Sequence, residues 1–179
     1  AMQRPGEAAD AFAAAVEHNP GLVASWRALR ELHARAGHER LARFARAQLD
    51  YLSELPPELL GVIDLTHEGQ LHQADQLCRQ FLRHNKHHVE AMRLLADIGI
   101  RLRIYDDAEF LLESCVELEP DNIRARGDYL KILNRKGKFA QAYEQACQLD
   151  EQQPQNPAWK IGMASALMGL GKVDEAVEL

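Results

Sequence analysis

Three histidines are concentrated in one short segment, and imidazole is a common metal ligand. His84, His87 and His88 belong to the run HNKHH. On a helix, His84 and His88 would share one face because they are four residues apart, and together they could bind a divalent metal. However, no cysteine or carboxylate is spaced to complete a ligand set, and Lys86 lies among the histidines. We therefore interpret the run as a polar turn exposed to solvent and predict no metal site, with metal binding as the alternative.

Residue types suited to covalent catalysis are present, but they are not arranged for it. Nucleophilic catalysis needs a hydroxyl or thiol beside a base, and the chain has no GxSxG motif, no paired cysteine-histidine motif and no phosphate-binding glycine loop. Cys78, Cys115 and Cys147 are far apart, so we expect no disulfide framework, a reducing cytoplasmic location, and cysteines that pack as small apolar residues. We predict no catalytic residue, no enzyme activity and no cofactor in this chain.

The placement of charged residues says more about function than the histidines and cysteines do. Residues 106–119 carry six acidic side chains and no basic one, and we expect these acids to face solvent. The segments on either side carry the basic residues Arg93, Arg101, Arg103, Arg124, Arg126, Lys131 and Arg135. Guanidinium groups bind carboxylates through paired hydrogen bonds. The candidates for attracting an acidic partner are Arg93, Arg101, Arg124, Lys131 and Arg135.

The elements that must position these side chains recur at a fixed interval. Ala108, Ala142 and Ala176 follow one another at steps of 34 residues, as do Pro120 and Pro154. A glycine series follows nearly the same spacing, and Arg103 stands at the one place where a glycine is missing; its members are Gly37, Gly69, Gly137 and Gly171. A period of 34 is typical of helix-turn-helix repeats that stack into a solenoid.

The repeat resembles the tetratricopeptide repeat (TPR) from about Gly6 to Leu179. The matching residues are Trp26, Leu29, Gly37 and Ala42 in one copy, Leu95, Ala96, Ala108 and Pro120 in another, and Leu133, Gly137, Ala142 and Pro154 in a third. The resemblance implies an all-α fold, a right-handed superhelical solenoid of antiparallel helix pairs. It would hold about five repeats, with incomplete repeats at both ends.

Hydrophobic periodicity and turn residues set the expected boundaries. We expect residues 1–5 to be a tag or disordered lead and residues 6–179 to form a single array. A lone second helix should span residues 6–18, followed by helix pairs at about 22–53, 56–85, 88–118, 121–151 and 155–179. Asp121 or Asn122 should cap one helix, and Asn156, with Pro157 after it, should cap another.

Composition excludes several function classes. The formal net charge is −6, which argues against a general nucleic-acid binder because phosphate neutralisation needs a basic surface. No apolar run approaches the roughly 18 to 20 residues that span a bilayer, so we expect no membrane partner. The remaining partners are a protein or peptide, including an acidic one, and a second copy of the chain joined through the open ends of the array.

In TPR proteins the first helix of each pair lines a concave groove, and the resemblance implies which positions point inward. Some TPR domains hold a peptide's terminal carboxylate with lysine, asparagine and arginine there, but Glu31 and Asp97 stand where the first asparagine would be, so that clamp is not transferred. The alternative is that the charges pair with one another on solvated faces, each pair contributing about 0.2 to 1 kcal/mol. The predicted partner-binding residues are Arg27, Arg93, Asp97, Arg101, Arg124, Lys131 and Arg135.

A finer resemblance concerns the alanine-rich start EAADAFAAAVEHNP and the end NPAWKIGMASALMGLGKVDEAVEL. Both are similar to the N-terminal TPR region of bacterial TPR-sulfotransferase proteins, in which a catalytic domain follows the repeats. No cofactor-binding segment of that domain is present, so no catalytic residue is transferred. Two functions are therefore expected. One is an interaction scaffold, and the other is an accessory region of a larger enzyme that positions substrate or mediates assembly.

Overall fold

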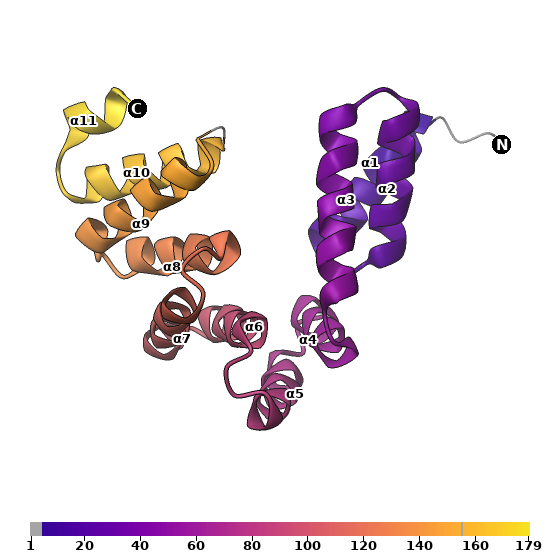
Figure 1. The fold of residues 1–179 in the computed structure, drawn as a ribbon, viewed down its shortest axis with the longest axis horizontal. Helices are drawn as coiled ribbons and strands as arrows, with labels where there is room; N and C mark the ends of the chain where they lie inside the picture. The colour runs from indigo at the N-terminus through magenta and orange to yellow at the C-terminus, as the bar shows by residue number, and fades with distance from the viewer. Residues whose placement is uncertain (1–4, 155) are drawn as a thin grey trace. The chain divides into compact units, whose positions relative to one another are not determined.

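A computed structural model describes residues 5–154 and 156–179, and all regular secondary structure in these ranges is helical (Figure 1). The all-α class and the helix-turn-helix organisation are confirmed. The expected lead lies outside the described residues, apart from Pro5, where the first helix begins. The helices are α1 (Pro5–His18), α2 (Val23–Arg35), α3 (Glu39–Glu54), α4 (Pro57–His67), α5 (Leu71–His84), α6 (Val89–Arg101), α7 (Tyr105–Leu118), α8 (Ile123–Arg135), α9 (Phe139–Gln152), α10 (Pro157–Gly169) and α11 (Val173–Val177).

Three of the repeated alanines lie where helices pack closely. Ala74, Ala108 and Ala142 have no exposed surface, and Cys78 and Cys115 are equally buried on the same helices. A larger side chain at such a position would overpack the interface between helices at about 1 to 3 kcal/mol. The period of 34 therefore reports a packing requirement, and it confirms that these two cysteines serve as small apolar residues.

Each helical hairpin closes on a residue in the left-handed conformation. Gly37, Gly69, Gly137 and Gly171 have φ between 73° and 78°, and Arg103 has φ of 63° at the corresponding place between α6 and α7. A side chain in this region costs about 1 to 2 kcal/mol, which glycine avoids. Arg103 thus makes the same turn as the four glycines, at a conformational cost.

Three first helices begin with a side-chain cap at corresponding positions. Asn122 Oδ1 accepts the N–H of Ala125 at 3.0 Å and Asn156 Oδ1 accepts that of Ala158 at 3.1 Å. His88 Nδ1 accepts the N–H of Ala91 at 3.3 Å. Of the two expected alternatives at the start of α8, Asn122 is therefore the cap. The cap at Asn156 and Pro157 in the first turn of α10 are confirmed.

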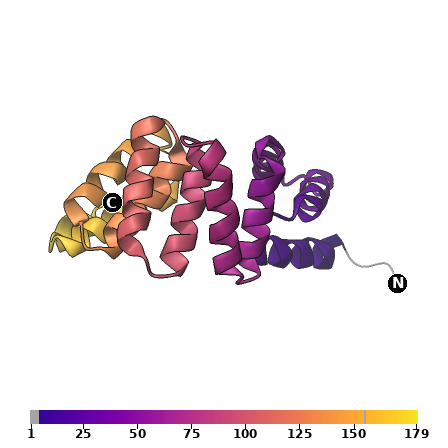
Figure 2. The ribbon, with the colours of Figure 1, turned by 90° about the horizontal axis from the view of Figure 1, so that it is seen from below.

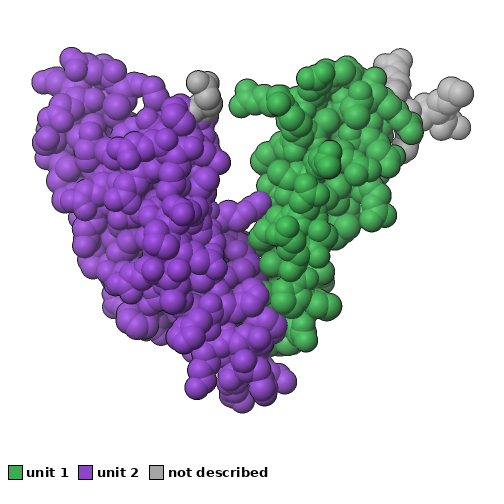
Figure 3. Space-filling view, viewed as in Figure 1, with its two compact units in different colours: residues 1–78 green, residues 79–179 purple. Residues whose placement is uncertain are grey.

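The chain divides into two compact units, residues 1–78 and 79–179, with the boundary inside α5 (Figure 3). In the first unit, Trp26 is buried on α2. Its indole N–H donates to the carbonyl of Pro20 at 2.8 Å, and the ring meets Phe44 of α3 edge-on with centroids 5.8 Å apart. Asn19 donates to Asp64 of α4 at 2.8 Å. These contacts fix the turn between α1 and α2 on α4.

In the second unit, successive helices from α6 to α10 pack side by side (Figures 1 and 2). Its core runs through all five helices and includes Ala96, Leu112, Leu133, Leu149 and Ala166. The first helices also touch one another, because α8 contacts both α6 and α10. Within this unit α6, α8 and α10 therefore form one continuous layer.

The expectation that all acids of residues 106–119 face solvent is wrong for one of them. Glu109 is buried, with 7% of its surface exposed, and it contacts both Lys136 and Lys138 at 2.5 Å. Burial alone would raise the pKa of Glu109, but hydrogen bonds from the two lysines and their charges lower it overall. This carboxylate ties α7 to the turn between α8 and α9.

Candidate partner-binding face

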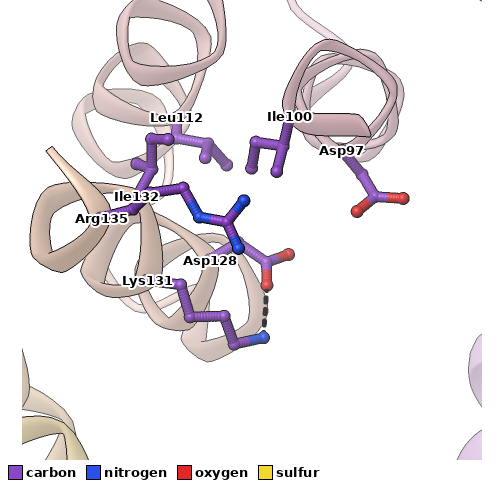
Figure 4. A pocket seen from close by; sticks show the side chains of 7 residues that line it. All are labelled: Asp97, Ile100, Leu112, Asp128, Lys131, Ile132 and Arg135. Carbon is purple, nitrogen blue, oxygen red and sulfur yellow. Dashed lines mark hydrogen bonds and ion pairs between the residues drawn. The ribbon is translucent and has the colours of Figure 1, made fainter. Parts of the chain in front are cut away.

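The candidate site is the exposed face of α6 and α8, where a pocket of about 210 Å³ opens between α6, α7 and α8. Its apolar floor consists of Ile100, Leu112 and Ile132, of which Leu112 and Ile132 are almost fully buried. Its charged rim consists of Asp97, Asp128, Lys131 and Arg135 (Figure 4). An apolar floor with a charged rim suits a partner side chain whose polar atoms remain at the surface.

Arg93 joins the two helices of this face. Its Nε donates to Glu90 on the same helix at 2.9 Å, and its Nη1 donates to Asp128 on α8 at 2.7 Å. The Arg93 side chain is only 15% exposed. Arg93 was predicted to bind a partner, but both of these carboxylates belong to the chain itself. Its observed role is to hold α6 to α8.

Asp128 was not among the predicted site residues, yet it is central to the face. Besides Arg93, it accepts a hydrogen bond from Lys131 at 2.8 Å. Burial raises the pKa of Asp128, but the nearby charges of Arg93 and Lys131 lower it overall, so the carboxylate is ionised at neutral pH. Sequence spacing offers a partial signal, because Asp128 precedes Lys131 by one helical turn. Its bond to α6 depends on packing between repeats.

The other charges on this face are more exposed. Arg101 Nε donates to Asp97 at 2.9 Å, and both side chains are about 40% exposed, so solvent weakens the attraction. Arg135 lies with its guanidinium 5.6 Å from the ring centroid of Tyr105, a cation–π arrangement. In Figure 4 its side chain extends across the pocket. The guanidinium is therefore oriented before any partner arrives.

The structure brings together only some of the predicted residues. Asp97, Lys131 and Arg135 line the pocket, while Arg93 and Arg101 lie beside it through their ion pairs. Arg124 is exposed near the start of α8, and Arg27 is exposed on α2 in the first unit. The predicted basic residues therefore do not form a wholly basic face, because acidic residues lie among them. Glu90 pairs with Arg93, Asp97 pairs with Arg101, and Asp128 pairs with Lys131.

Arg126, one of the basic residues that suggested this face, points elsewhere. It is 6% exposed and donates to the carbonyl of Pro120 and to Gln145 on α9, both at 2.6 Å, and also to Gln148. Burial lowers the pKa of this guanidinium, while the charge of Asp121 opposes the change. Arg126 therefore belongs to the contact between α8 and α9.

The histidine run forms part of a turn and a helix start. His88 caps α6, its ring meets Phe81 edge-on at 5.1 Å, and His84 Nδ1 lies 3.4 Å from the carbonyl of Gln80. In residues 5–154 and 156–179, no three histidine, cysteine, aspartate or glutamate side chains gather closely enough to hold a metal. Over the same ranges, no helix has the length and apolar character needed to cross a membrane.

Sequence comparison matches residues 103–160 to a family model described as tetratricopeptide repeat. The chain is 27% identical over 135 residues to tetratricopeptide repeat protein 21A of Mus musculus, covering 72% of this chain and 10% of that protein. It is 30% identical over 104 residues to the Vi polysaccharide export protein VexE of Salmonella typhi, covering 58% of this chain and 16% of that protein. The chain thus spans less than a fifth of either curated relative.

Solved structures extend the likeness over most of the chain. YrrB, described as a TPR protein with an unusual peptide-binding site, superposes with a TM-score of 0.62 at 18% identity, covering 95% of this chain and 89% of YrrB. MamA from AMB-1 gives 0.61 at 20% identity, covering 87% and 86%. A TPR protein from Parabacteroides merdae gives 0.57 at 19%, covering 97% and 71%. Residues 103–160 therefore match the tetratricopeptide repeat model, and the chain has the helical-hairpin fold of TPR proteins.

Proposed function

We propose that this chain is a protein-interaction scaffold that binds an extended segment of a partner on the face of α6 and α8. The observation that carries the proposal is the pocket there, in which charged side chains from both helices surround a floor formed by Ile100, Leu112 and Ile132. The description of YrrB as a peptide-binding TPR protein supports the same use of the fold. The absence of disulfide spacing among the three cysteines supports a cytoplasmic setting.

Two cations on the rim of the pocket, Lys131 and Arg135, can meet a partner segment that carries carboxylates. Lys131 is 74% exposed. The Arg135 side chain extends across the pocket (Figure 4), and its guanidinium lies 5.6 Å from the ring centroid of Tyr105. Exchanging an exposed ion pair for a similar one with a partner changes the free energy little, because each is worth only about 0 to 1 kcal/mol. Lys131 can therefore contact a partner's carboxylate, while the Arg93–Asp128 pair beneath it stays intact.

The test is binding of a fluorescein-labelled 12-residue peptide of alternating aspartate and serine, measured by fluorescence polarisation at two salt concentrations. We expect Lys131→Glu with Arg135→Glu to weaken binding at least tenfold. The matched control is Arg43→Glu with Arg46→Glu on α3, which makes the same charge change at two exposed residues. Equal weakening in both variants would mean that overall charge, rather than this face, captures the peptide, and the assignment would be wrong.

A second function is an accessory role inside a larger enzyme. It is favoured by the small share of each curated relative that the chain covers, since similar segments are parts of much longer proteins. The sulfotransferase link is supported by the sequence resemblance described above. Equilibrium binding of phosphoadenosine phosphosulfate to the full gene product tests the link, and no measurable binding would exclude it. A separate proposal is that copies of the chain associate through the ends of the array. Sedimentation velocity tests it, and a monomer at all concentrations would contradict it.

A further inference from the structure

Two of the second helices carry a phenylalanine on their outer side. Phe44 is the sixth residue of α3 and Phe110 is the sixth residue of α7. They are 55% and 68% exposed. The sixth residues of α5 and α9 are Gln76 and Glu144, and both are exposed as well. This repeat position therefore faces outward in all four helices, and two of them fill it with a large apolar side chain.

The exposure of the two rings does not come from the ends of the array. α7 packs against both α6 and α8, yet Phe110 remains outside these contacts. Phe44 has one neighbour, Trp26 of α2, which its ring meets edge-on with centroids 5.8 Å apart. Since Gln76 and Glu144 occupy the same position in helices of the same length as α7, the repeat does not need an apolar residue there.

The outer side of α7 is acidic. Glu113 and Glu117 follow Phe110 by three and seven residues, so they lie on the same side of the helix, and both are exposed. Tyr129 Oη lies 3.4 Å from Glu113, which is longer than an ordinary hydrogen bond between two oxygens. Among the described residues, Glu117 has no ion-pair partner. We call Phe110, Glu113 and Glu117 the acidic patch.

The outer side of α3 is basic near Phe44. Arg40 precedes Phe44 by four residues and lies on the same side of the helix. It is exposed, and in the part of the chain that the structure describes it has no ion-pair partner. Residues 40–49 hold three arginines and no acid, and Glu39 lies about 140° around the helix from Phe44. We call Arg40 and Phe44 the basic patch.

The two patches match when their helices lie antiparallel with the rings at the same level. Arg40 is then one turn from its ring in the direction in which Glu113 is one turn from Phe110. The guanidinium meets that carboxylate, with Glu117 one turn further. Antiparallel helices also oppose their dipoles favourably. Parallel helices would instead bring Arg40 to Asp106, which is already paired with Lys136.

We infer that copies of this chain associate by packing the basic patch of one copy against the acidic patch of another. Each contact covers two exposed rings and pairs an arginine with carboxylates. One helix against one helix is a small contact, so the association is transient, and salt weakens it because its charges are exposed. The pocket stays open, since Phe110 lies about 160° around α7 from the pocket residue Leu112.

The experiment is sedimentation velocity of the full chain over a concentration series at low and high salt. We expect the unmodified chain to associate with increasing concentration at low salt. Arg40→Glu or Glu113→Arg alone should weaken association at least about tenfold, because like charges then face each other. The matched controls are Arg83→Glu on α5 and Glu144→Arg on α9, which make the same charge changes at exposed residues outside the patches.

Restoration of charge gives a test that misfolding cannot imitate. An equal mixture of the Arg40→Glu and Glu113→Arg variants should associate as the unmodified chain does, because opposite charges face each other in every mixed pair. A chain that carries both substitutions should associate with itself for the same reason. Phe110→Ser should weaken association at least about tenfold while preserving the melting temperature, since the ring is mostly exposed.

Several results would overturn the inference. A monomer at all concentrations would do so, as would equal weakening by the Arg83→Glu and Glu144→Arg controls, which would assign the effect to overall charge. Failure of the mixture to associate would exclude the pairing of Arg40 with Glu113. Association that Arg40→Glu, Glu113→Arg and Phe110→Ser all leave unchanged would place the contact at the ends of the array instead. Binding of the aspartate-serine peptide is measured separately, so these outcomes leave the proposed function standing.

Discussion

The two units use charged side chains differently. In the first unit, Arg46 and Asp50 are 3.8 Å apart with side chains 74% and 66% exposed, and both belong to α3. In the second unit, Arg93 and Asp128 are 2.7 Å apart with side chains 15% and 24% exposed, and they join α6 to α8. The Arg46–Asp50 pair therefore lies on the surface of a single helix, whereas the Arg93–Asp128 pair connects two helices.

The two units also differ in how their first helices begin. The first helices of the second unit have side-chain caps at His88, Asn122 and Asn156. At the corresponding places in the first unit stand Leu22 and Pro56, and neither side chain accepts a capping hydrogen bond. The comparison teaches that first helices can begin at corresponding repeat positions with a side-chain cap or without one. Substitution of polar residues should distinguish the two units.

The largest expected difference lies between two arginines. Arg126→Met should destabilise the chain by about 2 to 3 kcal/mol, because it removes three hydrogen bonds that a buried guanidinium makes to Pro120, Gln145 and Gln148. Arg46→Met should change stability by less than about 0.5 kcal/mol, since its ion pair is exposed. Urea unfolding followed by circular dichroism measures both. Similar costs for the two variants would break the comparison.

A smaller difference is expected between two carboxylates. Glu109→Gln should cost about 1 to 2 kcal/mol at neutral pH, because two lysines lose their shared charged acceptor. The cost is limited because Lys138 is 45% exposed. Asp50→Asn should cost less than about 0.5 kcal/mol. Unfolding in urea at pH 7 gives both values, and a larger cost at Asp50 would contradict the contrast.

The same carboxylate predicts a pH dependence. Its lysine partners hold the pKa of Glu109 below the ordinary value of 4.5 in the folded chain. Its contribution to stability is therefore complete above about pH 4.5 and is lost as the pH falls through the folded-state pKa. The stability gap between the unmodified chain and Glu109→Gln should narrow on acidification below pH 4.5. A gap that widens would show that the sign is wrong.

The smallest effects are expected at the hairpin turns, where two substitutions should change the stability of the chain in opposite directions. Arg103→Gly should stabilise the chain by about 1 kcal/mol, because glycine adopts φ of 63° without strain. Gly37→Ala should destabilise it by about 1 kcal/mol at φ of 74°, although no atom lies within 4 Å of the added Cβ. Thermal unfolding reports both. Destabilisation by Arg103→Gly would indicate that the arginine side chain contributes contacts that outweigh its strained backbone.

The repeat architecture was predictable because it rests on local requirements. Ala108 and Ala142 are small where helices approach closely, and the glycine series marks residues with positive φ. The spacing also located the turn at Arg103, which interrupts the glycine series and yet has the same positive φ. Side-chain size and backbone conformation at single positions therefore identified the fold.

The face of α6 and α8 was less predictable because its charges choose partners across helices. Arg93, predicted to meet a ligand, is held by Asp128, which lies 35 residues away and was not predicted. Arg126 likewise finds its partner on another helix, because it donates to Gln145 of α9. Helix register gives the face on which a residue lies, but it does not give the angle between neighbouring repeats that decides which charges meet.

The histidine cap of α6 depends on a tautomer, which the asparagine caps do not. His88 Nδ1 can accept the N–H of Ala91 only in the tautomer that carries its proton on Nε2. The capping bond therefore also determines that the other ring nitrogen of His88 is a donor. Asn122 and Asn156 cap through an amide oxygen, which always accepts. The helix that supplies Arg93 and Asp97 thus begins with a cap that fixes the hydrogen-bonding role of both nitrogens of one ring.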